Sequence, residues 1–235
     1  MIVGEHSLRN LHFEEGERMI TRECLNNLRN ISKIFDLPIP LKDMTLTYLD
    51  HISLVNVKMG SAIEGHYWFS KVPSVFVKAE NEVICDPDGL TIGNLFIPKV
   101  TLGGTSVFSD SVPDMGWGKR DTVDTRIDVR QLKGLLMKDR VLRFVRDEKN
   151  TRMDVGNYIN PDRFFVDLSC VLSNDTGSEI ASSIRVDQLK QYKALLPSKG
   201  EVSVRFTTDH PVGFSWSDDM DNTYNILIAP TIGGL

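Results

Sequence analysis

The sequence predicts an α+β protein built from repeated units of one strand, one helix and three further strands (βαβββ). Two observations predict this fold class: a motif that occurs twice in the second half of the chain, and an apolar periodicity that changes from helical to alternating after each occurrence. The composition is that of a soluble globular protein, with 41% hydrophobic and 25% charged residues in a chain of 235. We therefore expect a substantial folded core.

The motif I-x-V-x-Q-L-K occupies residues 127–133 and returns at residues 184–190. A second pattern, R-F-x-x-D, occupies residues 143–147 and returns at residues 205–209. Both copies keep the order of the two patterns, and a longer loop in the second copy would account for its wider spacing. Residues from about 122 to 235 are thus predicted to hold two copies of one supersecondary unit.

Each copy is predicted to begin with a strand that runs into a helix of about ten residues, with leucines along one stripe of the helix. The first strands are expected at 125–129 and 180–186. The later β-rich segments are 140–146, 152–157 and 164–168 in the first copy, and 202–207, 212–217 and 224–228 in the second. Neither unit can bury its apolar face alone, so the two should pair, with both helices side by side on one surface.

Both predicted helices carry cationic residues opposite their apolar stripe. Solvated helix faces often carry lysines, but the duplication of the pattern in a chain of net charge −5 favours a basic surface confined to one face. The cationic residues are Arg130, Lys133 and Lys138 in the first copy, and Lys190 and Lys193 in the second.

With this duplication, the chain resembles DNA sliding clamps of the proliferating cell nuclear antigen (PCNA) type. The resemblance is carried by the helix at 187–196, by EVSVRFTTDHPVGFSW at 201–216 and by YNILIAPTIGG at 224–234. In addition, LDHISLVNV at 49–57 is similar to the family's D-x-x-H-V-x-L-V segment. The resemblance implies a two-domain sliding-clamp fold of βαβββ units, with helices inside around a DNA channel and sheets outside.

The resemblance divides the chain into a divergent N-terminal clamp domain at 1–101, an interdomain connector at 102–123 and a C-terminal clamp domain at 124–235. After residue 59 the sequence is β-rich and lacks a clear amphipathic helix, where family members carry a second strand–helix unit. The first domain is therefore expected to be abridged or to have a very short second helix.

In the first domain, residues 21–35 are predicted to form a helix, followed by strands at 44–49 and 52–59. The cations of this helix lie roughly opposite its apolar side. They extend the implied DNA-binding set with Arg22, Arg29 and Lys33.

The connector holds isolated large apolar residues among glycines and prolines, and a solvated loop cannot bury such side chains. This pattern favours a partner-binding surface. The resemblance implies that client proteins bind here through short peptide motifs. The implied client-binding residues are His51, Val107, Phe108, Pro211, Ala229, Pro230 and Ile232.

The segment FFVDLSCVL at 164–172 predicts an apolar edge strand, which promotes aggregation unless another strand covers it. The resemblance implies that it pairs with the last strand of domain one in a neighbouring subunit, near residues 90–97, to close a ring of three subunits. The implied interface residues are Phe164, Phe165, Val166 and Leu168 on one side, and Thr91 and Leu95 on the other.

The sequence lacks the patterns of the common enzyme and metal sites. Residues 116–120, GWGKR, resemble a phosphate-binding loop, but Pro113 stands where that loop requires glycine. The acidic run at 218–222 lacks the spacing of a calcium loop, and the histidines and cysteines lack metal-ligand spacing. We therefore expect no enzymatic activity, no cofactor and no metal.

No apolar run is long enough to span a membrane, and no signal-peptide pattern is visible. We therefore expect an intracellular protein that does not associate with membranes. It would act in the cytoplasm of a prokaryote, in a nucleus or at a viral replication site.

Two hypotheses of function stay open. The first is a sliding clamp, a polymerase processivity factor that encircles duplex DNA, is opened by a clamp loader, and tethers DNA polymerase and other replication and repair proteins. The second is a clamp-like interaction subunit, of the checkpoint type or a viral transcription or replication accessory, that does not form a free-sliding homotrimer. The divergent first half keeps the second hypothesis open.

Overall fold

The computed structural model describes residues 39–42, 45–49, 52–58, 66–69, 83–86, 89–92, 95–98, 121–136, 140–148, 150–156, 164–173, 179–219 and 221–231. The predicted helix at 21–35 and the predicted connector as far as residue 120 lie outside this part of the chain.

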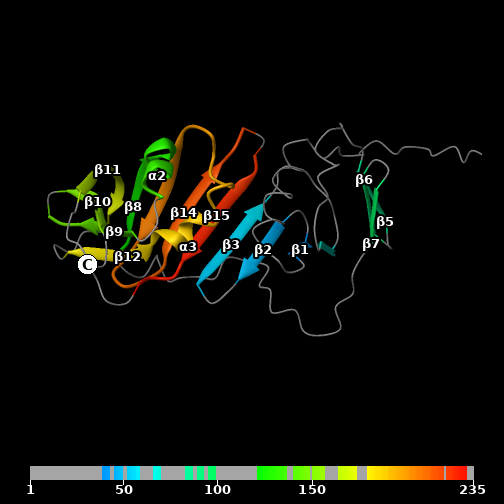
Figure 1. Cartoon of the computed structure of the whole chain (residues 1–235), viewed down its shortest axis with the longest axis horizontal. Coiled ribbons are helices and arrows are strands. Elements are labelled where there is room, and N and C mark those ends of the chain that lie inside the picture. The colour runs from blue at the N-terminus through cyan, green and yellow to red at the C-terminus, as the bar shows by residue number, and fades with distance from the viewer. Residues whose placement is uncertain are drawn as a thin grey trace, which may run out of the picture.

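The second half shows the predicted element order twice. The first copy consists of β8 (Val123–Asp128), α2 (Val129–Leu135), β9 (Val141–Arg146), β10 (Thr151–Gly156) and β11 (Phe164–Ser173). The second consists of β12 (Ile180–Arg185), α3 (Val186–Lys190), β13 (Glu201–Phe206), β14 (Val212–Ser217) and β15 (Thr223–Ile228) (Figure 1). The alternating apolar pattern thus indicates the strands of this region, and the helical apolar pattern indicates its two described helices.

The two helices are shorter than predicted, with seven and five residues. α2 begins after Asp128, whose carboxylate accepts hydrogen bonds from the main-chain N–H groups of Arg130 and Gln131 at 2.8 and 3.2 Å, as an N-cap does. After α3 the chain continues in tighter turns, in which the N–H groups of Tyr192, Lys193 and Leu195 donate to the carbonyls three residues earlier. Residues 191–195 are therefore helix-like but outside the α-helix.

Twelve strands form one sheet, in the order β12-β9-β10-β11-β8-β13-β14-β15-β3-β2-β1-β4, with every neighbouring pair antiparallel. The first half contributes β1 (Ile39–Lys42), β2 (Thr45–Leu49), β3 (Ser53–Lys58) and β4 (His66–Phe69). Figure 1 shows β3 beside β15, where the two halves of the chain join. The strands predicted at 44–49 and 52–59 are confirmed as β2 and β3.

A separate antiparallel sheet contains β5 (Val83–Asp86), β6 (Gly89–Ile92) and β7 (Leu95–Pro98), with β6 in the middle. These strands account for the β-rich character predicted for the sequence after residue 59. Among the described residues, no helix is long and apolar enough to cross a membrane.

The two repeat copies exchange strands in a twofold manner. β8 of the first copy pairs with β13 of the second, with Asp128 opposite Glu201. Reciprocally, β12 of the second copy pairs with β9 of the first, with Arg185 opposite Val141. Each pairing extends over the full length of both strands. The predicted pairing of the two units is therefore present in residues 123–228.

Main-chain hydrogen bonds at the helix starts follow the same exchange. The N–H of Val129 in α2 donates to Gly200 O of the second copy, and the N–H of Val186 in α3 donates to Arg140 O of the first, both at 2.9 Å. Each helix is thus anchored by the other copy, which places both helical segments over the same paired strands.

The strand exchange corrects the alignment of the repeat. Because Asp128 opposite Glu201 mirrors Arg185 opposite Val141, Val141 of β9 is equivalent to Glu201 of β13. The R-F-x-x-D patterns, which align Arg143 with Arg205, are therefore out of register by two positions. A slip of this size keeps each side chain on its face of a strand. Phe144 and Phe206 thus both point into the core, with ring centroids 5.8 Å apart.

The main core lies between the paired strands and the two helical segments. Val129 and Leu132 of α2, and Val186 and Leu189 of α3, are fully buried together with Phe144. The apolar stripe predicted for each helix is thus confirmed as its core-facing side, and the opposite side faces solvent.

Candidate functional site

The exposed side of the two helical segments carries the predicted cations. Arg130 of α2, Lys190 of α3 and Lys193 in the turns after α3 are exposed. Among the described residues these three side chains form no ion pair. The remaining predicted DNA-binding cations, apart from Lys133, lie outside the described residues: Arg22, Arg29, Lys33 and Lys138.

Lys133 is the exception among the predicted DNA-binding residues. Its side chain is half-buried, and Nζ donates hydrogen bonds to Leu196 O at 3.2 Å and Pro197 O at 2.6 Å. Burial, and secondarily the charge of Lys193, lower the pKa of Lys133 from its ordinary value of 10.5. Its ammonium group is therefore directed to the main chain of the second copy.

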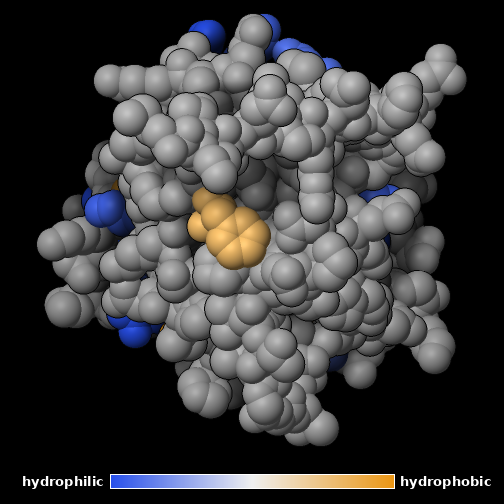
Figure 2. All heavy atoms as spheres, turned by 90° about the vertical axis from the view of Figure 1, so that its right-hand side faces the viewer, coloured by the Kyte–Doolittle hydropathy of each residue, from blue (hydrophilic) through white to orange (hydrophobic). Residues whose placement is uncertain are grey.

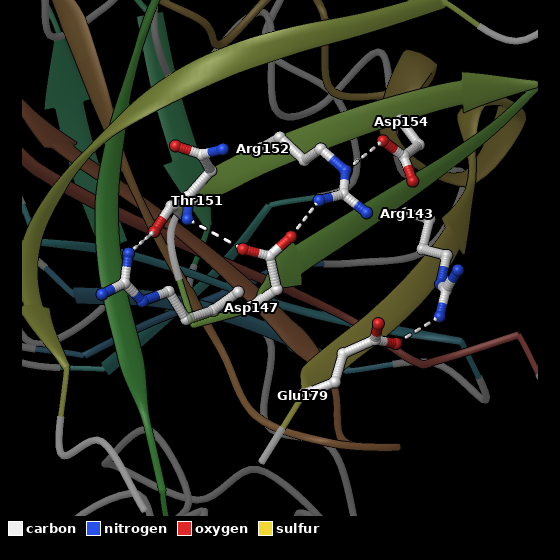
Figure 3. A network of polar contacts seen from close by, with 8 residues as sticks. Arg143, Asp147, Thr151, Arg152, Asp154 and Glu179 are labelled. Carbon is white, nitrogen blue, oxygen red and sulfur yellow. Dashed lines mark hydrogen bonds and ion pairs between the residues drawn. The ribbon is translucent and has the colours of Figure 1, made fainter. Parts of the chain in front are cut away.

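Five arginines on the strands, in contrast, are paired with carboxylates, while Arg146 of β9 donates to Thr151 Oγ1. Arg152 lies between Asp147 and Asp154, with Nε at 3.0 Å from Asp154 Oδ1, and Arg143 Nη2 lies 2.8 Å from Glu179 Oε1 (Figure 3).

The same holds for three further arginines at strand positions. Their ion pairs are Arg126 with Glu201, Arg185 with Asp187, and Arg205 with Asp124. Five strand arginines of the described region thus have carboxylate partners, whereas Arg130, Lys190 and Lys193 on the helical side form no ion pair there.

A second candidate surface forms where the C-terminal residues leave β15. The N–H of Ala229 donates to Ile52 O, and the N–H of Thr231 donates to Ser183 O in β12, both at 2.7 Å. This tail therefore spans from the start of β3 to β12. Ala229 and Pro230, both predicted client-binding residues, are half-buried along it.

The loop between β13 and β14 reaches the same part of β12. The N–H of Asp209 donates to Ala181 O at 3.2 Å, and Ser182 Oγ donates to His210 O at 2.6 Å. Pro211, another predicted client-binding residue, follows directly and is half-buried. The C-terminal tail and this loop, which were predicted separately to bind clients, thus both contact β12.

Ile52 belongs to this surface, and the sequence analysis missed it. Its side chain is 43% exposed, and its carbonyl holds the tail at Ala229. An exposed isoleucine next to the predicted residue His51 was the available signal. The other predicted client-binding residues, His51, Val107, Phe108 and Ile232, lie outside the described residues.

A third candidate surface is the edge of β11. Residues 164–168 pair with β10 on one side, and residues 169–173 pair with β8 on the other. In the described part of the chain, no strand covers the remaining edge of 164–168. Phe164 and Phe165 there are 44% and 65% exposed. Val166 and Leu168 pack into the core, so only their main chains are available at the edge.

The opposite side of the predicted interface lies in the small sheet. Thr91 lies in β6, whose two edges are both paired, so the strand predicted to add to a neighbour cannot be β6. β7, with Leu95, has one unpaired edge among the described strands. Phe96 of β7 is 48% exposed. Figure 2 shows hydrophobic atoms among the described atoms of the face that it displays.

The described residues contain no group of three or more His, Cys, Asp or Glu side chains suited to hold a metal ion. The acidic turn at 218–222 is organised by its own contacts. Asp218 accepts hydrogen bonds from the main chain and side chain of Asn222 and from Tyr224 Oη. This turn is therefore a closed hairpin connection.

No protein-family model matches the chain, and no curated protein matches it. Among solved structures, it is similar to A. fulgidus PCNA in a complex with the C-terminal region of FEN-1, with a TM-score of 0.66 and 17% identity over 93% of this chain and 99% of that one. It is also similar to PCNA from Thermococcus kodakaraensis, with a TM-score of 0.63 and 14% identity over 91% of this chain and 98% of that one. At these identities the likeness concerns the fold, and the chain has a PCNA-like sliding-clamp fold.

Proposed function

We propose that this chain works as a DNA sliding clamp, a non-enzymatic ring subunit that encircles duplex DNA and tethers client proteins to it. The observation that carries the proposal is the charge distribution on a sliding-clamp fold. Five strand arginines are paired with carboxylates, whereas Arg130, Lys190 and Lys193 on the helical side form no ion pair among the described residues.

This charge distribution suits a protein that slides. Phosphate contacts supply affinity that is independent of base sequence, so the binding energy is similar at every position along the duplex. Long cationic side chains on exposed helical segments provide such contacts. The net charge of −5 then resides on other surfaces, where it disfavours binding of DNA outside the ring.

Strand topology supports ring closure by further copies of the chain. In the first half of the chain, neighbouring strands of the sheet follow the order β4, β1, β2, β3. The second half shows the equivalent order β12, β9, β10, β11. β3 receives β15 on its outer edge, with Ser53 opposite Ile228. We propose that the equivalent edge of β11 receives a strand of a neighbouring copy, with β7 as the candidate, in a ring of three subunits made of two clamp domains each.

The surface around Ile52, Pro211 and the tail at Ala229 is the proposed client site. It is partly apolar, and it presents main chain from two segments held against β12. The similar A. fulgidus PCNA was solved with the C-terminal region of FEN-1 bound. By analogy we propose that DNA polymerase and other replication and repair proteins bind here through short peptide segments, inside the cell, after a clamp loader has opened the ring.

The decisive experiment is primer extension on singly primed circular DNA, with the cognate polymerase and clamp loader. The proposal predicts longer products per binding event when the chain is added, and no increase with any cognate pair would overturn it. Light scattering after size exclusion distinguishes the alternative function. A stable trimer supports the sliding clamp, whereas a monomer that assembles only with other chains supports a clamp-like interaction subunit.

A further inference from the structure

Two lysines at equivalent positions of the repeat have different surroundings. Lys133 and Lys190 each end one copy of the motif I-x-V-x-Q-L-K. Lys190 is exposed and makes no ion pair among the described residues, whereas Lys133 is half-buried and bonded to two main-chain carbonyls. The repeat therefore contains a matched pair of residues with the same chemistry and different contacts.

The difference follows from the length of one connection. Residues 191–200 separate Lys190 from β13, whereas the shorter stretch 134–140 separates Lys133 from β9. The longer stretch contains Leu196 and Pro197, whose carbonyls accept from Lys133 Nζ at 3.2 and 2.6 Å. A main-chain carbonyl withdrawn from water needs such a donor, and an ammonium group is a strong one.

These bonds hold the two copies together on their cationic side. Lys133 belongs to α2, and both acceptors follow the turns that carry Lys193. Two of the three N–H groups of its ammonium are used in this way. Lys133 therefore has little capacity left for a phosphate, while Lys190 and Lys193 keep theirs.

We propose that Lys133 is a positioning residue, which ties α2 to residues 196–197 of the second copy and so sets where Lys193 lies, and that its repeat equivalent Lys190 is a DNA contact. This assignment rests on the proposed sliding-clamp function for its DNA-binding part. The tie between the two copies does not depend on that function.

The test compares Lys133→Met and Lys190→Met in the full chain, since methionine keeps the apolar stem and removes the charge. A linear DNA duplex is the probe, and the slope of log affinity against log salt counts phosphate contacts. Lys190→Met should reduce the slope by about 0.9 and leave the melting temperature unchanged. Lys133→Met should lower the melting temperature by about 3 °C or more, and should reduce the slope only to the extent that Lys193 loses its phosphate contact.

Two further measurements separate positioning from mere stabilisation. Lys133→Arg keeps charge and donors, so it should restore the melting temperature and the amide-exchange protection of Val129, whose N–H donates to Gly200 O. In a double-mutant cycle, Lys193→Met should weaken DNA binding less in the Lys133→Met background than in the wild type, because Lys193 has already lost its place.

A lower slope in Lys133→Met, with the wild-type melting temperature, would show a phosphate contact and overturn the proposal. Additive effects of Lys133→Met and Lys193→Met would overturn the positioning role. If the wild-type chain shows neither salt-dependent binding to the duplex nor longer primer-extension products on circular DNA with the clamp loader, the sliding-clamp function fails instead. The contact between Lys133 and the carbonyls of residues 196–197 is tested separately, by measuring the melting temperature and amide exchange without DNA.

Discussion

The hydroxyl group of Tyr192 hydrogen bonds to the hydroxyl group of Ser53, which lies 139 positions earlier in the chain. Both side chains are buried. Tyr192 belongs to the turns after α3, and Ser53 is the first residue of β3, opposite Ile228 of β15. A single buried contact thus links the cationic helical side to the junction between the two halves of the chain.

Removing this contact should destabilise the protein without changing its surface. Tyr192→Phe is expected to lower the free energy of unfolding by about 0.5–1.5 kcal/mol, the usual net worth of a buried hydrogen bond. Urea denaturation measures it. Ser53→Ala is the matched variant, and the double variant should lose clearly less than the two single losses combined. Full additivity would show that the two hydroxyl groups do not act together.

The aromatic core under the exchanged strands is expected to dominate stability. Phe144 is fully buried, and its ring lies 5.8 Å from Phe206 and 6.0 Å from Phe214 between centroids. Phe144→Ala should lower the free energy of unfolding by about 3–5 kcal/mol because it leaves a cavity. Phe144→Leu, which keeps much of the volume, should lose clearly less. Equal losses in both variants would contradict a cavity effect.

The edge of β11 gives a prediction about assembly. Phe165 lies exposed in residues 164–168 of β11, the part of the strand whose outer edge is open among the described residues. If the chain forms the proposed ring, Phe165→Asp should leave the subunit folded and convert that ring to monomers. Light scattering gives the mass, and the melting temperature of the monomer serves as the folding check. Asp167→Asn on the same strand, also exposed, is the control and should remain assembled. A ring that persists in Phe165→Asp would place the subunit contact elsewhere.

The client surface predicts a loss of peptide binding that spares assembly. Ile52→Asp places a charge beside the tail at Ala229 and, if this surface is the proposed client site, should weaken binding of a client peptide about tenfold or more, since an apolar contact is replaced by a desolvated carboxylate. Calorimetric titration measures the affinity. Lys58→Met, exposed at the other end of β3, should bind as the wild type does. Unchanged affinity in Ile52→Asp would remove Ile52 from the site.

Local sequence patterns were sufficient to predict the helices and strands of the second half. Alternating apolar residues located each strand, although β11 extends to Ser173, beyond the predicted 164–168. The leucine stripe identified the buried side of α2 and α3, where Leu132 and Leu189 are fully buried. These features depend on neighbours in the chain, so the sequence contains them directly. The helix lengths were overestimated, because the turns after Lys190 keep a helical pattern without an α-helix.

The contacts between distant residues were not accessible in the same way. The motifs aligned Arg143 with Arg205, while the pairing of β9 with β12 and of β8 with β13 aligns Arg143 with Ser203. A slip of two positions leaves the apolar pattern unchanged, so only the register distinguishes the alignments. Thr91 was predicted at the subunit interface, and the sequence did not show that β6, where it lies, is flanked by β5 and β7.

The sequence by itself determined the duplicated unit, the order of its elements and which side of each strand or helix is apolar, because periodicity is a local property. Only the tertiary structure decided which strands pair between the copies, that Ile52 joins the tail at Ala229, and that Lys133 turns to Pro197 while Lys190 remains exposed. Identical motifs diverge in this way because a side chain's partner depends on loop lengths and on residues far away in the chain, as Pro197 is from Lys133.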